Sequence, residues 1–187
     1  RVYKAHRIMP YSWKLTTPLS NFEAGNNYKD VQDPAITVRF KAASDVHRLR
    51  SSQATQPNTA CEHITDGNGS SLGTWIVLHP LKPLYFLAWT TTPWTLPGNL
   101  ALAVGPNVDY VVVEDDKDQY VLAQVLVEKY FKKGAYSIRG VLSGHDLTRQ
   151  GKDVHYEPLF PYFRPEFPET SNKFRVISEE VVSTSDG

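Results

Sequence analysis

The chain has 187 residues, of which 41% are hydrophobic and 21% charged, a composition typical of one globular domain with or without an appended arm. Its 20 Lys and Arg residues balance 20 Asp and Glu residues, which argues against a wholly electrostatic nucleic-acid binder. The single cysteine, Cys61, excludes an internal disulfide, and no apolar run approaches the roughly 20 residues of a membrane span. We therefore expect a soluble, cytoplasmic protein without a membrane partner, and the missing initial methionine favours a piece of a longer one.

The amino-terminal half begins with a basic arm, because four basic side chains precede the first acid, Glu23: Arg1, Lys4, Arg7 and Lys14. Residues 36–40, ITVRF, alternate and are β-branched, which predicts a strand. Residues 41–73 are rich in Ser, Thr, Asn, Gly and Pro. Such a composition cannot bury much apolar surface, so we expect a mobile polar loop or insertion there.

The second half alternates short apolar runs with turn residues. Strands are predicted at 74–78, 84–89, 101–104, 110–113, 135–140 and 173–182, with a charged hairpin turn at 114–119. A helix is predicted over 122–133, where apolar residues fall at helical spacing before Gly134. Since strands outnumber helices, we expect an α+β fold, predominantly β, in a closed or nearly closed barrel.

The threonine-rich stretch LYFLAWTTTPWTLPGNLA, residues 84–101, is the most unusual feature of the sequence. Pro93 and Pro97 argue against a regular helix, so a strand ending near Trp89 is expected to lead into a fixed loop. Four hydroxyls are gathered there, on Thr90, Thr91, Thr92 and Thr95. They could bind ribose hydroxyls, an ester carbonyl or water, or they could cap their own backbone.

The peptide WTTTPWTLPGN, residues 89–99, closely resembles the threonine-rich peptide in the editing domain of isoleucyl-tRNA synthetases. Valyl and leucyl enzymes typically carry an arginine where this chain has Thr92. The segment TPLSNFEAGNNYKDVQDPAITVRF, residues 17–40, resembles the approach to the same domain, notably in the eukaryotic cytosolic type. The resemblance extends more loosely over 154–187, whereas 41–73 departs from the family pattern.

This resemblance implies a barrel-like class I editing domain with one or two short helices over residues 34–187, incomplete at its carboxyl end. Residues 1–33 would be a basic connecting arm that leads from the catalytic domain of the parent protein. The implied activity is hydrolysis of the ester of valyl-tRNA(Ile), with valyl-adenylate as a further candidate substrate. The implied partners are the tRNA(Ile) acceptor end carrying valine and that catalytic domain, and no cofactor or metal is implied.

The same resemblance assigns roles within the site. Thr90, Thr91 and Thr92 would form the catalytic wall that positions the ester and a water, without themselves removing a proton. Trp89, Thr95 and Asn99 would bind the substrate, and Trp94 would pack beneath the loop. The family pocket is completed by a segment of the type GTG-I/V-VH-x-AP and a following aspartate, so the chain, ending in VVSTSDG, is expected to carry part of the site.

Other assignments are less favoured. A valyl-type editing domain is disfavoured by Thr92, and a non-catalytic module that binds the tRNA acceptor end stays open. The absence of HIGH and KMSKS motifs places ATP-dependent activation elsewhere in the parent protein. Cys61 and His63 lack the further ligands of a zinc site, and His145-Asp146 is expected in a loop. The aromatic residues of 156–168 are expected to cover a barrel end rather than to stack on RNA bases.

Overall fold

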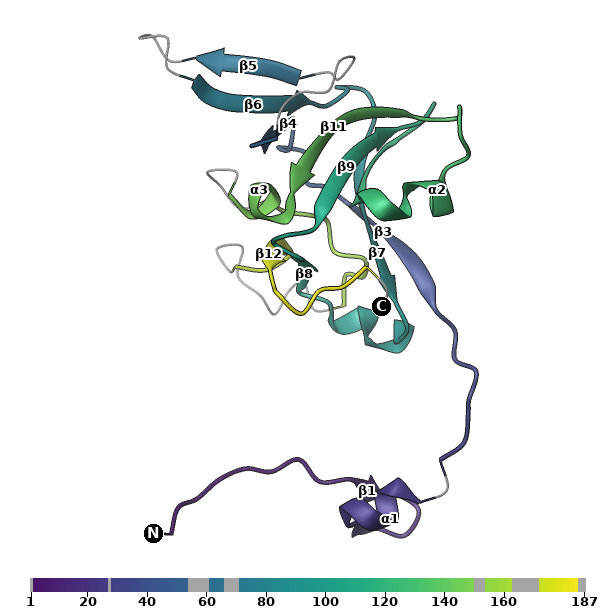
Figure 1. The fold of residues 1–187 in the computed structure, drawn as a ribbon. Coiled ribbons are helices and arrows are strands. Elements are labelled where there is room, and N and C mark those ends of the chain that lie inside the picture. Colours follow the sequence, from purple (N-terminus) through teal and green to yellow (C-terminus); the bar gives the residue numbers. More distant parts are fainter. Residues whose placement is uncertain are drawn as a thin grey trace. The chain divides into compact units, whose positions relative to one another are not determined.

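The computed structural model describes residues 2–26, 28–53, 61–65, 71–149, 154–162 and 172–184. The chain divides into two compact units, an amino-terminal unit, Arg1–Asp33, and a main unit, Pro34–Gly187. In the amino-terminal unit, β1 (Tyr11–Ser12) pairs with β2 (Thr17–Pro18), and α1 (Asn21–Gly25) follows (Figure 1). Helix α1 begins with a capping box, in which Ser20 and Glu23 satisfy each other's backbone N–H groups.

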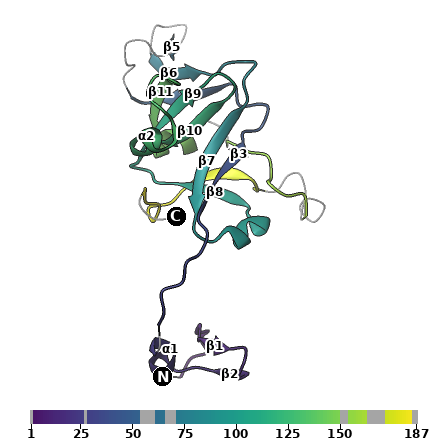
Figure 2. The ribbon, with the colours of Figure 1, turned by 90° about the vertical axis from the view of Figure 1, so that its right-hand side faces the viewer.

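A five-stranded sheet in the order β11-β9-β10-β7-β3 forms the centre of the main unit (Figures 1 and 2). Its strands are β3 (Ile36–Lys41), β7 (Leu84–Thr90), β9 (Asp109–Glu114), β10 (Gln119–Ala123) and β11 (Ser137–Ser143). The pairing of β10 with β7 is parallel, and the other pairings are antiparallel. The strands predicted at 36–40, 84–89, 110–113 and 135–140 are confirmed, as is the hairpin turn that joins β9 to β10.

A second sheet, in the order β4-β6-β5, lies where a polar loop was predicted. It consists of β4 (Arg48–Ser51), β5 (Cys61–Thr65) and β6 (Ser71–Val77). The polar loop predicted over 41–73 is wrong over β4, β5 and the start of β6, whereas the strand predicted at 74–78 is confirmed in β6. A few buried apolar side chains are enough to hold these strands in a sheet, because Leu49 and Ile76 pair across β4 and β6 and are fully buried. The sheet approaches β11 so closely that a Cβ at Gly140 would lie 2.6 Å from Ile76 Cγ1.

A third pairing joins β8 (Ala101–Val104) to β12 (Arg175–Ser178) in parallel, at two more predicted strand positions. The main unit is therefore α+β and predominantly β, as predicted. Within the described residues, β11 and β3 form the two ends of the five-stranded sheet and do not pair with each other. The closed form of the predicted barrel is thus not found in the described part of the chain.

The helices of the main unit are short: η1 (Pro93–Gly98), η2 (Gln124–Leu126), α2 (Val127–Tyr130) and α3 (Gly144–Thr148). The predicted helix over 122–133 is wrong at both ends. Leu122 belongs to β10, where pairing with Val111 and burial override the helical pattern. The expected loop at His145-Asp146 is also wrong, because Ser143 and Asp146 form the capping box of α3.

Alternation along β9 and β10 places apolar residues on both faces of the central sheet. On one face, Val112 and Val121 join the main core, which also contains Phe40, Phe86 and Leu102. On the other face, a smaller cluster consists of Val111, Val113, Tyr120, Leu122 and Val127 of α2. The sheet is therefore buried on both sides, and β7 runs out of this core at Thr90.

Candidate functional site

The threonine loop, Thr90–Asn99, begins at the end of β7 and contains η1. Pro93 occupies the first turn of this 3-10 helix, where no intrahelical donor is needed. Backbone hydrogen bonds run from Thr95 N to Thr92 O and from Asn99 N to Leu96 O, each 3.0 Å long. The two prolines thus allow a tight 3-10 turn where a loop without regular helix was predicted.

The hydroxyls of the loop are linked in a row. Thr92 Oγ1 lies 3.3 Å from Thr90 Oγ1 and 3.4 Å from Thr95 Oγ1. Two further bonds hold the backbone: Thr92 N donates to Thr90 Oγ1 at 3.1 Å, and Thr95 Oγ1 donates to Thr92 O at 2.8 Å. The interpretation that these threonines cap their own backbone is therefore confirmed for Thr90 and Thr95. Thr91 is exposed, and within the described residues its hydroxyl has no hydrogen-bond partner.

A cavity of about 230 Å³, the threonine cavity, lies between this loop and β3. Its polar rim is formed by Trp89, Thr90, Thr95 and Asn99. Its remaining lining is apolar and comes from β3, β7, η1 and β8: Val38, Phe40, Ala88, Leu96 and Leu102. The structure thus brings four of the six predicted site residues around one cavity, whereas Thr91 and Thr92 do not line it. Such a cavity can hold a small aliphatic group beneath hydroxyl and amide groups.

Asn99 is fixed at the exit of the loop. Its Nδ2 donates to Ala101 O at 2.9 Å, and its Oδ1 accepts a short hydrogen bond from Tyr156 Oη. Tyr156 is 3% exposed, and its burial raises the pKa of its phenol, so the hydroxyl keeps its proton at neutral pH. Tyr156 was predicted to be one of the aromatics that cover a barrel end, and no pattern in the sequence indicates that its hydroxyl reaches Asn99.

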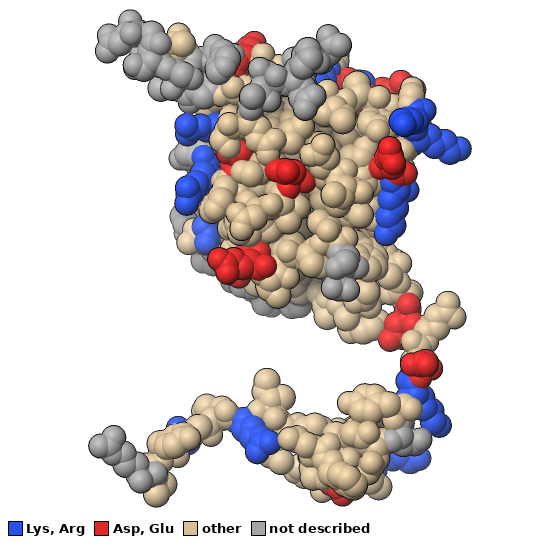
Figure 3. Space-filling view, in the orientation of Figure 1, with Lys and Arg blue, Asp and Glu red and all other residues tan. Residues whose placement is uncertain are grey.

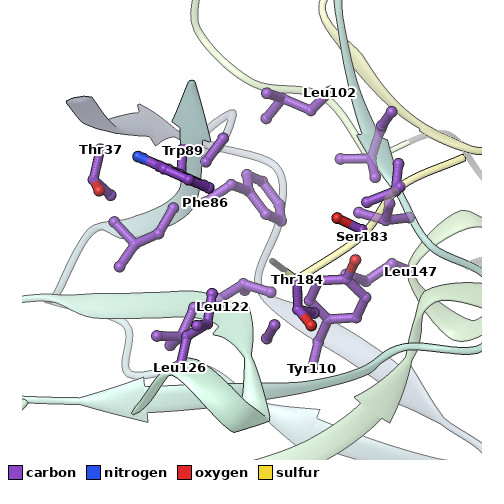
Figure 4. A pocket seen from close by; sticks show the side chains of 18 of the residues that line it. Thr37, Phe86, Trp89, Leu102, Tyr110, Leu122, Leu126, Leu147, Ser183 and Thr184 are labelled. Atoms are coloured by element: carbon purple, nitrogen blue, oxygen red, sulfur yellow. The ribbon is translucent and has the colours of Figure 1, made fainter. Parts of the chain in front are cut away.

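A larger cavity of about 630 Å³ adjoins the first, since Ala88, Trp89 and Leu102 line both. Figure 4 shows Trp89 and Thr37 across this cavity from Ser183 and Thr184. Most of its lining is apolar and includes Phe86, Leu122, Leu126 and Leu147. Its size admits a planar ring system, so the two cavities together could hold a ligand with a small and a large part.

Trp89 lies on the wall between the two cavities and is half-buried. The ammonium of Lys129, on α2, lies 5.2 Å from the centre of its ring, within the range of a cation–π contact. Next to it, Thr37 Oγ1 and Tyr130 Oη are 2.9 Å apart. Helix α2 and strand β3 therefore hold the edge of the site on which Trp89 lies.

Other predicted features take different positions. Trp94 is 61% exposed and does not pack beneath the loop, because the 3-10 turn directs it outward. Phe160 and Tyr162 are exposed and stacked, with ring centres 5.5 Å apart, so of the described aromatics here Tyr156 alone covers the core as predicted. Phe163 and Phe167 lie outside the described residues.

Charged side chains of both signs are scattered over the face of the main unit in Figure 3, without one broad basic patch. Among the described residues, no group of three or more His, Cys, Asp and Glu side chains could hold a metal ion. Likewise, no helix in the described part of the chain is long and apolar enough to cross a membrane.

Comparisons with known proteins identify one family. The family model of class I tRNA synthetases (I, L, M and V) matches residues 1–176. The cytoplasmic isoleucine–tRNA ligase of Saccharomyces cerevisiae is 38% identical over 192 residues, which cover 100% of this chain and 14% of the yeast protein. The isoleucine–tRNA ligase of Treponema denticola is 37% identical over 201 residues, covering 100% of this chain and 16% of the relative. The chain thus spans a small part of the length of these relatives.

Proposed function

The chain belongs to the class I tRNA synthetases, and we propose that its main unit is the editing domain of an isoleucine-specific member. In this proposal, residues 34–187 hydrolyse the ester of valyl-tRNA(Ile), with valyl-adenylate as a second substrate. Residues 1–33 connect them to the catalytic domain of a longer, cytoplasmic isoleucine–tRNA ligase. The partners are that catalytic domain and the acceptor end of tRNA(Ile) carrying valine.

The observation that carries this proposal is the threonine cavity, with its hydroxyl and amide rim above an apolar floor. A pocket that binds isoleucine favours it over valine by only about 1–3 kcal/mol of binding free energy, because the two differ by one methylene. Isoleucyl-tRNA synthetases are themselves the standard example of this general figure. Accurate charging therefore needs a second site that accepts the smaller product. A cavity of about 230 Å³ suits the aliphatic side chain and ester of such a product.

The polar rim supports hydrolysis by positioning. Thr90 and Thr95 line the cavity, and Thr92 connects their hydroxyls. A threonine hydroxyl is a poor base at neutral pH, so these groups hold the ribose and the ester carbonyl by hydrogen bonds while a water attacks. Placing water and ester in one geometry supplies much of the rate without a covalent intermediate. Thr91, which is exposed beside the cavity, would act once the acceptor end is bound.

The neighbouring large cavity supports a ligand with two parts. Because Trp89 lines both cavities, an aminoacyl group in the threonine cavity would have its adenosine directed past this ring. Trp89 therefore serves in this proposal as a substrate-binding wall, and Asn99 as a further polar group of the rim.

Deacylation of valyl-tRNA(Ile) and isoleucyl-tRNA(Ile) tests this function directly. It is measured for the 187-residue chain and for a chain extended past Gly187 through the expected histidine and aspartate. We expect the longer chain to hydrolyse the valyl ester in preference to the isoleucyl ester. If both chains fold and bind tRNA but neither hydrolyses the ester, a non-catalytic module that binds the acceptor end replaces the editing assignment.

A further inference from the structure

We propose that Tyr156 is a positioning residue that sets the orientation of the Asn99 amide for the substrate. The inference rests on the proposed editing function and adds a residue that the resemblance did not assign. Tyr156 touches no cavity that holds the ester in this proposal, so it acts through Asn99. Its hydroxyl donates a hydrogen bond to Asn99 Oδ1.

The hydrogen-bonding capacity of Asn99 is half used. A side-chain amide has two N–H donors and two acceptor lone pairs. One donor goes to Ala101 O at 2.9 Å, and one lone pair accepts from Tyr156. Because Asn99 lines the threonine cavity, the remaining donor and the remaining lone pair are available to a ligand there.

The two partners allow one orientation of this amide. A backbone carbonyl can only accept, so Ala101 O requires Nδ2 on its side. Oδ1 must then face Tyr156, whose hydroxyl donates to it. If the amide turned over, Oδ1 would face the carbonyl oxygen of Ala101 and the hydrogen bond from Nδ2 to Ala101 O would be lost. Removing the Tyr156 hydroxyl would leave the orientation to one contact.

Tyr156 is itself held rigidly. Its ring meets those of Phe40 and Phe174 edge to face, with centres 5.3 and 5.9 Å apart and interplanar angles of 80° and 77°. Its backbone forms a bridge with Ala42 at the end of β3. Because Tyr156 is only 3% exposed, these contacts fix the position of its hydroxyl. The fixed hydroxyl in turn holds the Asn99 amide in one orientation.

The backbone ties Tyr156 to the exit of the threonine loop as well. Tyr156 N donates to Phe174 O at 2.8 Å, and Phe174 N donates to Leu100 O at 2.6 Å. Phe174 has a φ of 53°, a left-handed conformation that a bulky residue adopts only where its surroundings hold it. Leu100 follows Asn99 directly, so side-chain and backbone contacts from Tyr156 converge on the same point of the loop.

The test is Tyr156→Phe, which removes the hydroxyl and keeps the ring. The probe is 3′-(L-valyl)amino-3′-deoxyadenosine, in which an amide replaces the scissile ester, and binding to the 187-residue chain is measured by calorimetry. We expect about tenfold weaker binding, the effect of losing one oriented hydrogen bond. The matched control is Tyr120→Phe, which removes another buried phenol hydroxyl, bonded to Asp118 Oδ2 at 3.1 Å, and which should leave binding unchanged.

A double-mutant cycle separates positioning from general destabilisation. Asn99→Ala removes the group through which Tyr156 acts, so adding Tyr156→Phe to it should weaken binding no further. Additive losses in the cycle would overturn the inference. So would a Tyr156→Phe protein that binds the probe as tightly as the wild type.

NMR of the Asn99 side chain tests the inference even if the probe does not bind, because it does not depend on editing. In ¹⁵N NMR spectra, the side-chain amide of Asn99 should shift and exchange faster with solvent in Tyr156→Phe and stay unchanged in Tyr120→Phe. If neither the 187-residue chain nor the chain extended past Gly187 binds the probe, the proposed function fails, and this spectrum still decides whether Tyr156 orients Asn99. An unchanged Asn99 amide in Tyr156→Phe contradicts the inference in either case.

Discussion

The two ends of β7 are both held by polar side chains, in opposite ways. Near Leu84, where the strand begins, the side chain of Gln119 is fully buried and makes three backbone hydrogen bonds. His79 N donates to its Oε1 at 2.8 Å, and its Nε2 donates to His79 O and Lys82 O at 3.2 and 2.9 Å. At the other end, where the strand stops at Thr90, the hydroxyls of Thr90 and Thr95 are bonded to near neighbours, and both residues line a cavity.

The difference separates polar groups that hold the fold from polar groups that are available to a ligand. Both hydrogens of the Gln119 amide are used inside the protein. By contrast, Asn99 keeps one donor and one lone pair, and Thr91 is exposed. A buried polar group without a partner is costly, whereas an exposed one can exchange water for a ligand. Substitutions at the two ends of β7 should therefore affect different properties.

The largest effect on stability is expected for Gln119→Leu. The leucine has a similar volume, but it leaves the backbone N–H of His79 without an acceptor and the carbonyl groups of His79 and Lys82 without a donor. The free energy of unfolding should therefore fall by about 3–4 kcal/mol. Urea unfolding followed by circular dichroism measures this loss. The control is Gln124→Leu at an exposed position, where we expect a change within about 0.5 kcal/mol. Equal effects at both positions would contradict the distinction between the two ends.

The next effect concerns Glu114, close to Gln119. Its carboxylate accepts hydrogen bonds from Arg139 Nε and, at 2.7 Å, from Lys82 Nζ. These bonds, that from Arg139 first, lower its pKa from the ordinary 4.5 to about 2. Since the folded-state pKa lies below the unfolded-state value, the stabilisation is fully present above pH 4.5 and is lost as the pH falls from 4.5 towards 2.

Glu114→Gln should therefore cost about 2–3 kcal/mol of unfolding free energy at pH 7 and flatten the pH dependence between pH 4.5 and 2. Urea unfolding at several pH values provides both quantities. Glu157→Gln is the matched control, because Glu157 pairs with Lys41 on the surface, where half of its side chain is exposed. We expect little change at that position. A wild-type curve as flat as that of Glu114→Gln would refute the role of this cluster.

Most of the central sheet could be predicted from the sequence, because its strands bury apolar runs such as Tyr110–Val113 on both faces. In the β4-β6-β5 sheet, most of β6 was predicted as the strand at 74–78, but β4 and β5 were not. Strands β4 and β5 are mostly polar, and Leu49 becomes informative only once it pairs with Ile76 of β6, which packs against Gly140. Leu122 is the opposite case: it has the spacing of a helical residue, but it lies in β10 because it pairs with Val111. Long-range pairing therefore accounts for both errors.

Within the site, four of the six predicted residues line the threonine cavity, but the sequence did not predict how they are held. Trp89, Thr90, Thr95 and Asn99 lie within eleven residues, so a single turn brings them to one cavity. Tyr156 is 57 residues from Asn99 and reaches it through the fold. No local pattern marks such a pair. The contact depends on Tyr156 being placed by β3 and by the strand pairing of β12 with β8, which the sequence does not specify.

The smallest effect on stability, and the clearest on activity, is expected for Thr92→Val. Valine keeps the shape and removes a hydroxyl whose two contacts, at 3.3 and 3.4 Å, are long and exposed. The backbone bonds from Thr92 N and to Thr92 O remain, so the free energy of unfolding should change by less than about 0.5 kcal/mol. Hydrolysis of valyl-tRNA(Ile) by the extended chain should nevertheless fall at least about tenfold, because the row of hydroxyls is interrupted. The control is Thr148→Val on α3, which removes a hydroxyl 3.3 Å from Gly144 O. We expect its stability to match that of Thr92→Val and its rate of hydrolysis to match the wild type. If Thr92→Val unfolds as easily as Gln119→Leu, or hydrolyses the ester at the wild-type rate, the threonine end of β7 is a structural cap like the other end.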